Sequence, residues 1–302
     1  MRNGSKSVLT SLALLLTLIL SFQTESWAWG REAHIDINKV AAEHIPPSMP
    51  EFLRKATDRI AHLGPEPDRW REEGGYSLQN AESPNHFIDL ERIEGLGRLP
   101  RGRYQFYRLL SAKRAATKNH PDDLLPERVG TLPYAAIERY DQLLVAFREY
   151  RRLQSTGRPT DIVAPEIVFF AGTLGHYVGD GSQPLHTTVQ YNGWTGPNPR
   201  DYRTQAGIHS EFETGYVSRN MMPQDFEPLV HAPVRLDHPF ENFMTYLRHS
   251  HSLVERVYQL GKERAFGGPG TNEAQEFVEK RLAAGSQMLL DLWYTAWVDS
   301  AN

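Results

Sequence analysis

Apolar side chains recur along much of this chain with the period of an α-helix. In the clearest case, residues 134–153, five of them follow at intervals of three or four: Ile137, Tyr140, Leu144, Phe147 and Tyr150. Side chains at this spacing form one buried stripe of a helix. The same pattern predicts helices over residues 31–45, 50–63, 239–260 and 272–298, and another that Asp161 and Pro165 open.

No segment shows the strict alternation of a β-strand. Loops are predicted where turn-forming residues gather, at residues 64–84, 91–123 and 190–207; the last of these is rich in Gly, Pro and Asn. No shift in composition marks a linker. We therefore expect an all-α fold, with residues 29–302 forming a single multi-helical domain.

The N-terminal segment has the composition of a secretory signal peptide. A short basic stretch precedes an apolar run over residues 8–20, and the small residues Ser26 and Ala28 would stand at the −3 and −1 positions of a cut before Trp29. The apolar run is too short to span a bilayer comfortably. We expect residues 1–28 to be removed and the protein to be secreted or periplasmic, with no stable membrane insertion.

Charge and cysteine content narrow the possible classes of protein. The chain has no cysteine, which excludes disulfides, a lipoprotein anchor and thiolate zinc sites. Removal of the predicted signal peptide leaves 31 basic and 36 acidic side chains, a formal charge of −5. This balance argues against a broad basic surface for long nucleic acids, but is compatible with a metal site that binds one phosphate.

The segment GHYVGDGSQPLH, residues 175–186, holds the strongest candidate chemistry. His176 and Asp180 are four residues apart and project from one face of the predicted helix, and His186 follows after the turn. Zinc takes nitrogen and oxygen ligands in a tight shell, so this cluster suits a zinc site. The alternative is that the first two residues form an ordinary intrahelical hydrogen bond.

Three further segments offer ligands of the same kind. His209 and Glu213 are again four residues apart and open a predicted helix, His86 stands in NHFIDL, and His34 follows Trp29 by five residues. The other seven histidines are interpreted as core or surface residues without a metal role.

Taken in order, these motifs resemble those of a superfamily that unites the zinc-dependent phospholipases C and the single-strand-specific zinc nucleases. The resemblance runs from Trp29 to Glu213 and rests on nine positions: Trp29, His34, Asp68, His86, His176, Asp180, His186, His209 and Glu213. It implies an all-α fold with a trinuclear zinc site, and hydrolysis of phosphoric ester bonds.

The resemblance also assigns ligands to three Zn²⁺ ions. The first would be bound by Asp68, His86, His176 and Asp180, and the second by His186, His209 and Glu213. The third would be bound by His34, by Asp180 as a bridge, and by the backbone amine and carbonyl of Trp29. A free α-amine offers zinc a lone pair that a peptide nitrogen does not, so cleavage before Trp29 would help to form the site.

Further roles follow from the same resemblance and from the chemistry of zinc. Asp68 and Asp180 are the predicted catalytic carboxylates, with Asp68 orienting the attacking water or taking its proton. Arg71 is predicted to help neutralise phosphate, and Phe87 and Asp89 stand where the nuclease branch binds a base. Zinc lowers the pKa of bound water and offsets the negative charge of a phosphodiester.

Substrate class is the open question. The short gap between Trp29 and His34 and the long gap between His186 and His209 favour a single-strand nuclease or 3′-nucleotidase. Glu213 at the last ligand position is typical of the phospholipases C, the alternative that acts on phospholipid head groups.

Two features weaken the nuclease assignment without settling the question. The chain lacks cysteine, whereas the eukaryotic nucleases carry disulfides, and the nuclease branch's Gly-Gly-Asn stretch is replaced by a loop with Tyr191 and Trp194. A non-catalytic zinc-binding helical protein is the alternative of another class. The only partner expected is the substrate, which would be single-stranded nucleic acid, a nucleotide or a phospholipid. No protein partner is predicted.

Overall fold

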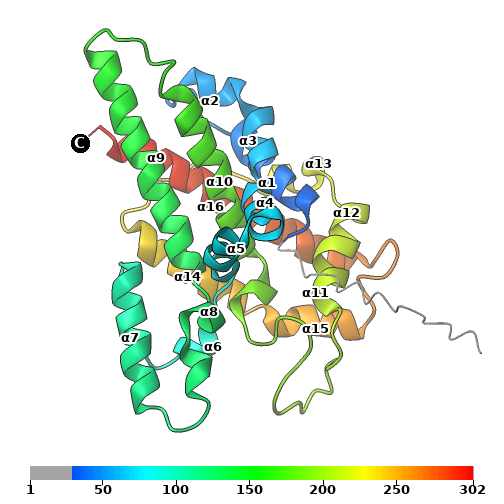
Figure 1. Cartoon of the computed structure of the whole chain (residues 1–302). Helices are drawn as coiled ribbons and strands as arrows, with labels where there is room; N and C mark the ends of the chain where they lie inside the picture. Colours follow the sequence, from blue (N-terminus) through cyan, green and yellow to red (C-terminus); the bar gives the residue numbers. More distant parts are fainter. Residues whose placement is uncertain (1–28, 302) are drawn as a thin grey trace, which may run out of the picture.

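A computed structural model describes residues 29–301, and helices dominate this range (Figure 1). The described residues contain no β-strand; strand-like pairing is limited to two isolated bridges, Ile88 with Gly130 and Tyr191 with Gly193. The all-α prediction is confirmed. The predicted signal peptide, residues 1–28, lies outside the described residues.

Helix α10 (Ala164–Ser182) is the centre of the fold, and every residue from 171 to 182 is buried. It crosses the middle of the molecule in Figure 1. Its main packing partners are α1 (Arg31–Glu43), α3 (Thr57–Leu63), α9 (Leu132–Ser155), α14 (Pro239–His251) and α16 (Asn272–Asp299). A helix that is packed on most sides carries hydrophobic side chains on most faces, so its few buried polar side chains point to a function.

Helix α1 can pack closely against α10 because position 175 of α10 is a glycine. A Cβ at Gly175 would lie 1.7 Å from Oδ1 of Asn38 on α1. The amide nitrogen of Asn38 donates hydrogen bonds to the carbonyl oxygens of Ile60 (2.8 Å) and Gly172 (2.9 Å). The buried side chain of Asn38 thus links α1, α3 and α10, which pack together behind the predicted metal ligands.

The long predicted helices are present, and two of them are divided. Residues 50–63 form α2 (Glu51–Lys55) and α3, which part at Ala56, where the backbone leaves helical geometry (φ −98°, ψ 14°). Residues 239–260 form α14 and α15 (Val254–Lys262), with a similar departure at Leu253 (φ −100°, ψ 0°). Hydrophobic spacing survives such a short interruption, so the sequence pattern did not reveal either break.

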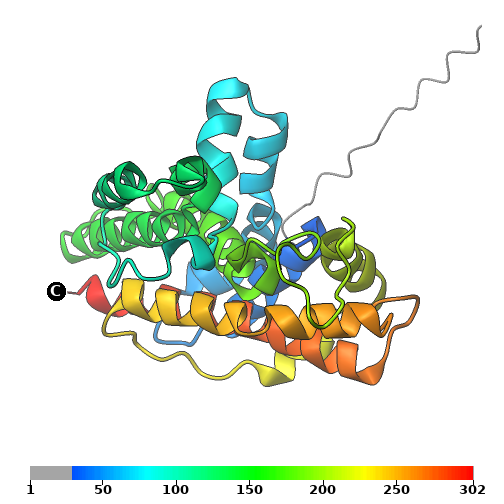
Figure 2. The same ribbon diagram turned by 90° about the horizontal axis from the view of Figure 1, so that it is seen from below.

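Two of the three predicted loops are largely helical, and those predictions were wrong. Residues 64–84 contain α4 (Glu66–Glu73), α5 (Tyr76–Glu82) and the start of the 3₁₀ turn η1 (Ser83–His86); residues 91–123 contain most of α6 (Leu90–Ile93), α7 (Arg103–Ala116) and the 3₁₀ turn η2 (Pro121–Leu124). Their apolar faces are small: α5 buries no residue completely, and α7 buries two, Phe106 and Leu110. In Figure 2 the cyan hairpin of α4 and α5 projects from the body.

The predicted irregular loop at residues 190–207 is confirmed, since no helix forms there. The hydroxyl of Tyr258 on α15 fixes its start, donating to the carbonyl oxygen of Gln190 (2.5 Å) and accepting from the amide of Gly193 (2.9 Å).

The other short elements complete the described chain. They are α8 (Pro126–Val129), η3 (Pro184–Thr187), α11 (Ile208–Ser210), the π-helical turn η4 (Glu211–Tyr216), α12 (Val217–Asn220), α13 (Pro223–Phe226) and η5 (Glu227–Leu229). None of the helices within residues 29–301 combines the length and apolarity needed to cross a bilayer.

We expect Gly175→Ala to lower the free energy of unfolding by about 1–3 kcal/mol, because the new methyl group displaces the Asn38 amide from its two acceptors. Urea denaturation of the metal-loaded protein measures the change. Gly75→Ala is the matched control, since a Cβ there meets no atom within 4 Å. Equal unfolding midpoints for the two variants would show that α1 and α10 have room to separate.

Candidate metal centre

Eight of the nine predicted ligand positions converge in the described structure. They come from six stretches of chain and all are buried: His34 (α1), Asp68 (α4), His86 (η1), His176 and Asp180 (α10), His186 (η3), and His209 and Glu213 in the adjoining α11 and η4. Their ligand atoms form three groups whose members lie within 4.8 Å of one another: His34, His176 and Asp180; Asp68, His86 and His176; His186, His209 and Glu213.

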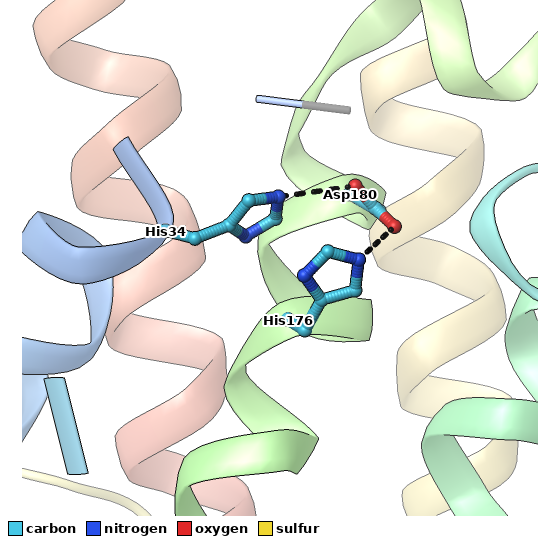
Figure 3. Close-up of side chains that lie close together, drawn as sticks. All are labelled: His34, His176 and Asp180. Carbon is cyan, nitrogen blue, oxygen red and sulfur yellow. Dashed lines mark ion pairs between the residues drawn. The ribbon is translucent and has the colours of Figure 1, made fainter. Parts of the chain in front are cut away.

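The carboxylate of Asp180 is the common element. Its Oδ1 lies 3.5 Å from Nε2 of His34 and 3.4 Å from Nδ1 of His186. Its Oδ2 lies 3.3 Å from Nε2 of His176 and 3.2 Å from Nδ1 of His86. Figure 3 shows His34 and His176, from two different helices, approaching the two oxygens of this one carboxylate. Such a side chain can bridge two cations.

The group around His86 has the dimensions of a four-coordinate metal site. Nδ1 of His86 lies 2.9 Å from Nε2 of His176 and 3.6 Å from Oδ1 of Asp68, and the last two atoms are 3.8 Å apart. With zinc–ligand bonds of about 2.0–2.1 Å, ligand atoms of a tetrahedral site lie about 3.3 Å apart. Together with Asp180, these three residues supply four ligand atoms.

The second group combines His186, His209 and Glu213. Nε2 of His209 lies 2.8 Å from Oε2 of Glu213 and 3.1 Å from Nε2 of His186. Glu213 lies in the π-helical turn η4. Single π turns are rare and recur at functional sites, where they change the direction in which a side chain points.

Backbone acceptors fix the tautomers of two of these rings. Nδ1 of His186 donates to the carbonyl oxygen of His86 (2.7 Å), and Nδ1 of His209 donates to that of Tyr191 (3.0 Å). Both Nε2 atoms therefore carry lone pairs, yet they face each other across 3.1 Å. Two lone pairs repel at that distance, and a cation between them removes the repulsion. Second-shell contacts of this kind are typical of metal-bound histidines.

The pKa values of the ligands also fit a cation. Burial lowers the pKa of His86 to about 4, with the positive charge of Arg71 as a further cause, and burial lowers that of His209 to about 4. Both rings are therefore neutral at pH 7 and able to bind metal. Burial raises the pKa of Glu213 to about 7. Burial alone would raise the pKa of Asp180 too, but His176 and His186 hold it well below its usual range.

Unsatisfied polar atoms gather at the same place. Of twelve buried side-chain polar atoms without a hydrogen-bond partner in the described residues, seven belong to His34, Asp68, His86, Asp180 and Glu213. Asp68 forms an ion pair with Arg71 (2.9 Å), but neither of its oxygens accepts a hydrogen bond. Leaving such groups unpaired costs free energy, and metal coordination would recover it for those among them that bind the ion, such as the oxygens of Asp68 and Asp180. The residues present thus fit a metal centre.

The ninth predicted ligand, Trp29, begins the described chain beside this cluster. Its indole is fully buried, donates a hydrogen bond to Oγ of Ser182 (2.7 Å) and packs against the ring of Phe212 (centroids 5.3 Å apart). Ser182 follows Asp180 by two residues, and Phe212 precedes Glu213. These contacts hold Trp29 at the edge of the metal cluster, while coordination by its backbone stays a prediction.

A cleft of about 390 Å³ opens over the cluster, and His86, His186 and His209 form part of its lining. The three predicted substrate-binding residues, Arg71, Phe87 and Asp89, line it as well.

Two of these three residues, Arg71 and Asp89, already form ion pairs within the protein. Arg71 pairs with Asp68 and its side chain is only 18% exposed, so it is not a solvated surface charge. Oδ2 of Asp89 accepts a hydrogen bond from Nε of Arg92 (2.8 Å), and burial raises the pKa of Asp89 to about 6.

Two side chains that support the cluster were not predicted from the sequence. Gln183 is fully buried, and its Nε2 donates to Oε2 of Glu213 (2.9 Å). Ser182 anchors Trp29. Both belong to the GSQP segment, which was predicted only as the turn before His186. Arg92 and Arg128 also line the cleft. Arg92 stands in the predicted loop 91–123, and Arg128 lies just after it, where no element was predicted.

Comparisons with known proteins give distant likenesses. No protein-family model matches the chain. A probable serine protease of Bradyrhizobium tropiciagri is 25% identical over an alignment that takes in 93% of this chain and 40% of that protein, so the chain spans less than half the length of this curated relative. The alpha toxin of Clostridium absonum shares 13% identity and a TM-score of 0.44 over 91% of this chain and 67% of the toxin.

The histidines and carboxylates on which the resemblance to the zinc phospholipases C and zinc nucleases rests thus come together in three groups. The seven histidines without a predicted metal role lie outside the three groups.

We expect Glu213→Gln to lose one bound metal ion per chain, because the amide removes a charge from the group formed with His186 and His209. Metal analysis after desalting measures the stoichiometry. Glu211→Gln is the control, since Glu211 stands two residues away and pairs at the surface with Arg203. Full metal content in Glu213→Gln would remove this residue from the ligand set.

Proposed function

We propose that this protein is an exported zinc-dependent phosphodiesterase, and that its substrate is single-stranded nucleic acid or a nucleotide with a 3′-phosphate. The observation that carries the proposal is the cluster of buried histidines and carboxylates around Asp180, at the floor of a cleft lined by arginine and aromatic side chains.

Zinc is the cation that this ligand set suits best, because imidazole and carboxylate at tetrahedral spacing are its preferred ligands. Three ions would be held as the sequence resemblance implies, with Trp29 and Asp180 completing the site at His34. Bound zinc lowers the pKa of water and offsets the negative charge of the substrate, supplying a nucleophile at neutral pH.

The chain's own side chains orient the substrate and offset its negative charge. Arg71 lies at the cleft wall with Nη2 2.9 Å from Oδ1 of Asp68, so its remaining guanidinium donors are placed to bind a phosphate oxygen. Asp68 is nearly fully buried, at 3% exposure of its side chain, and accepts the proton of the attacking water. The two residues thus bring a base and a phosphate-binding cation to one edge of the cluster.

An open coordination position favours catalysis over a structural role. The group of His186, His209 and Glu213 offers three ligand atoms. Gln183 lies beside it, but its Oε1 accepts a hydrogen bond from the amide of Leu185 (2.5 Å), which leaves an NH₂ group facing the cluster. An amide nitrogen does not bind zinc. A zinc ion held by these three residues would keep a fourth position for solvent or substrate, as in catalytic zinc sites.

The lining of the cleft favours an anionic nucleotide. Arg71, Arg92 and Arg128 line it, and Phe87 and Tyr191 add two aromatic side chains. Guanidinium groups bind phosphate, and aromatic faces stack on bases with little dependence on sequence. A phospholipid head group is the alternative substrate, because glutamate at position 213 is typical of the phospholipases C.

Proteolysis by a serine nucleophile is not supported by the described residues. Within residues 29–301 no hydrogen bond joins a serine hydroxyl to a histidine ring; the buried hydroxyls of Ser182, Ser250 and Ser286 donate to backbone carbonyls instead. A serine protease requires that pairing of nucleophile and base.

We expect Asp68→Asn to lower kcat on phosphodiester substrates by about 10²–10⁴-fold, because the amide cannot accept a proton. The assay compares single-stranded DNA, RNA, a 3′-nucleotide and phosphatidylcholine, with the chain starting at Trp29 and loaded with zinc. Asp58→Asn, an exposed change on α3, is the control. Cleavage of lipid alone would overturn the nucleic-acid assignment, and no cleavage of any of the four substrates would overturn the phosphodiesterase.

We expect one extra residue before Trp29 to lower zinc content by one ion per chain, because the α-amine becomes a peptide nitrogen. Metal analysis gives the readout independently of activity. An extension that a specific protease can remove provides the control, since trimming back to Trp29 should restore the third ion. Three zinc ions in the extended chain would exclude the terminal amine as a ligand.

A further inference from the structure

Basic residues are concentrated in one segment of an otherwise acidic chain. Residues 95–118 contain seven of the chain's 33 lysines and arginines and none of its 37 aspartates and glutamates. The remainder of the chain therefore has 26 basic side chains against 37 acidic ones. We call residues 95–118 the basic arm; its C-terminal half is α7, which stands to the side of the body in Figure 1.

Surface acids neutralise only part of this charge. Arg98 and Arg101 pair with Glu241, Arg103 pairs with Glu138, and Arg114 pairs with Asp122. Three cations of the arm, Arg108, Lys113 and Lys118, are exposed and form no ion pair with any described residue. Counting the three partner acids against the seven cations leaves a net charge of +4 on this surface.

The arm also offers a groove and an aromatic side chain. Arg98, Arg101 and Arg108 line a shallow groove of about 760 Å³, together with apolar atoms of Leu99 and Leu109. Tyr104 is 80% exposed on the same helix. Cations alternating with an exposed ring are typical of surfaces that bind single-stranded nucleic acid, where the backbone follows the charge and bases stack on the ring.

Two short elements link the arm to the cleft. Helix α7 packs on η2, where Arg114 pairs with Asp122, and η2 packs on α8, which carries Arg128. Arg128 and Arg92 line the cleft, and both pair with Asp123 of η2. A strand bound along the arm is thereby directed toward the wall of the site.

We propose that the basic arm binds the strand flanking the scissile phosphate, so that the substrate is a single-stranded polynucleotide of several residues rather than a mononucleotide. The inference rests on the proposed phosphodiesterase function and extends it. A membrane surface is a poorer fit, because no Trp, Phe or Leu is among the fully exposed residues of α7; Leu109 is only partly exposed, in the groove.

The decisive variant replaces the unpaired cations together, Arg108→Gln, Lys113→Gln and Lys118→Gln. Its binding to a labelled 20-residue phosphorothioate DNA strand is followed by fluorescence anisotropy. We expect Kd to rise at least about tenfold near 0.1 M salt, and the slope of log Kd against log salt to fall by up to about 2, since each lost phosphate contact removes about 0.7 on a single strand.

The matched control removes the same charge elsewhere, at exposed cations without ion pairs: Arg59→Gln, Arg158→Gln and Arg219→Gln. Its Kd should stay within about twofold of the unmodified chain. An equal loss in both triple variants would mean that net charge, not the arm, sets affinity, and would overturn the proposal.

A second pair of variants tests stacking without a change of charge. We expect Tyr104→Ala to weaken strand binding several-fold and Tyr104→Phe to retain it. Tyr76→Ala, at a tyrosine 81% exposed on α5, provides the control. If Tyr104→Ala binds as tightly as the unmodified chain, the ring has no part in holding the strand.

Two further measurements separate this inference from the proposed function. Turnover of bis(p-nitrophenyl) phosphate, too small to reach the arm, should be unchanged in the arm variant; an equal loss there would place the three cations in the cleft and overturn the arm. Loss of binding to phosphatidylglycerol vesicles with unchanged strand binding would make the arm a lipid contact instead. If the chain binds the strand through the arm but cleaves no substrate, the proposed phosphodiesterase function would be refuted and the inference about the arm would stand.

Discussion

One buried carboxylate, that of Asp180, holds the described structure together at its functional end. Its two oxygens lie within 3.5 Å of ring nitrogens from four histidines, His34, His86, His176 and His186. A carboxylate without exposure to water is costly unless positive charge surrounds it. The surrounding helices therefore have to bring those rings to it, and the tight packing of α1 and α3 on the glycine-bearing face of α10 is what allows this.

The sequence predicted which residues lie together in the cluster better than it predicted the elements that carry them. His176 and Asp180 could be found because helical spacing places them on one face, and the resemblance supplied Asp68 from its place in the motif order. The helix under Asp68 was missed, since α4 buries little apolar surface and shows no clear period. Gln183 and Ser182 were missed because their roles depend on contacts with distant residues, Glu213 and Trp29, that no local pattern encodes.

Net charge alone does not locate the surfaces of this chain that can bind an anion. A formal charge of −5 without residues 1–28 argues against a broad basic surface. The average hides an uneven distribution of charge, because residues 95–118 carry basic side chains and no acidic ones. A polyanion responds to the local potential within about a Debye length of 8–10 Å. The position of the charges depends on how α7 packs on η2 and could be judged only from the fold.

The hydrogen bond from the His186 ring to the carbonyl oxygen of His86 has a consequence for how the centre assembles. It ties the backbone of a ligand in one metal group to the ring of a ligand in another, and Asp180 contacts both residues. In the proposed trinuclear centre, occupation of one group would therefore order the ligands of the next, which is a favourable coupling free energy between the sites. Such a centre would fill cooperatively.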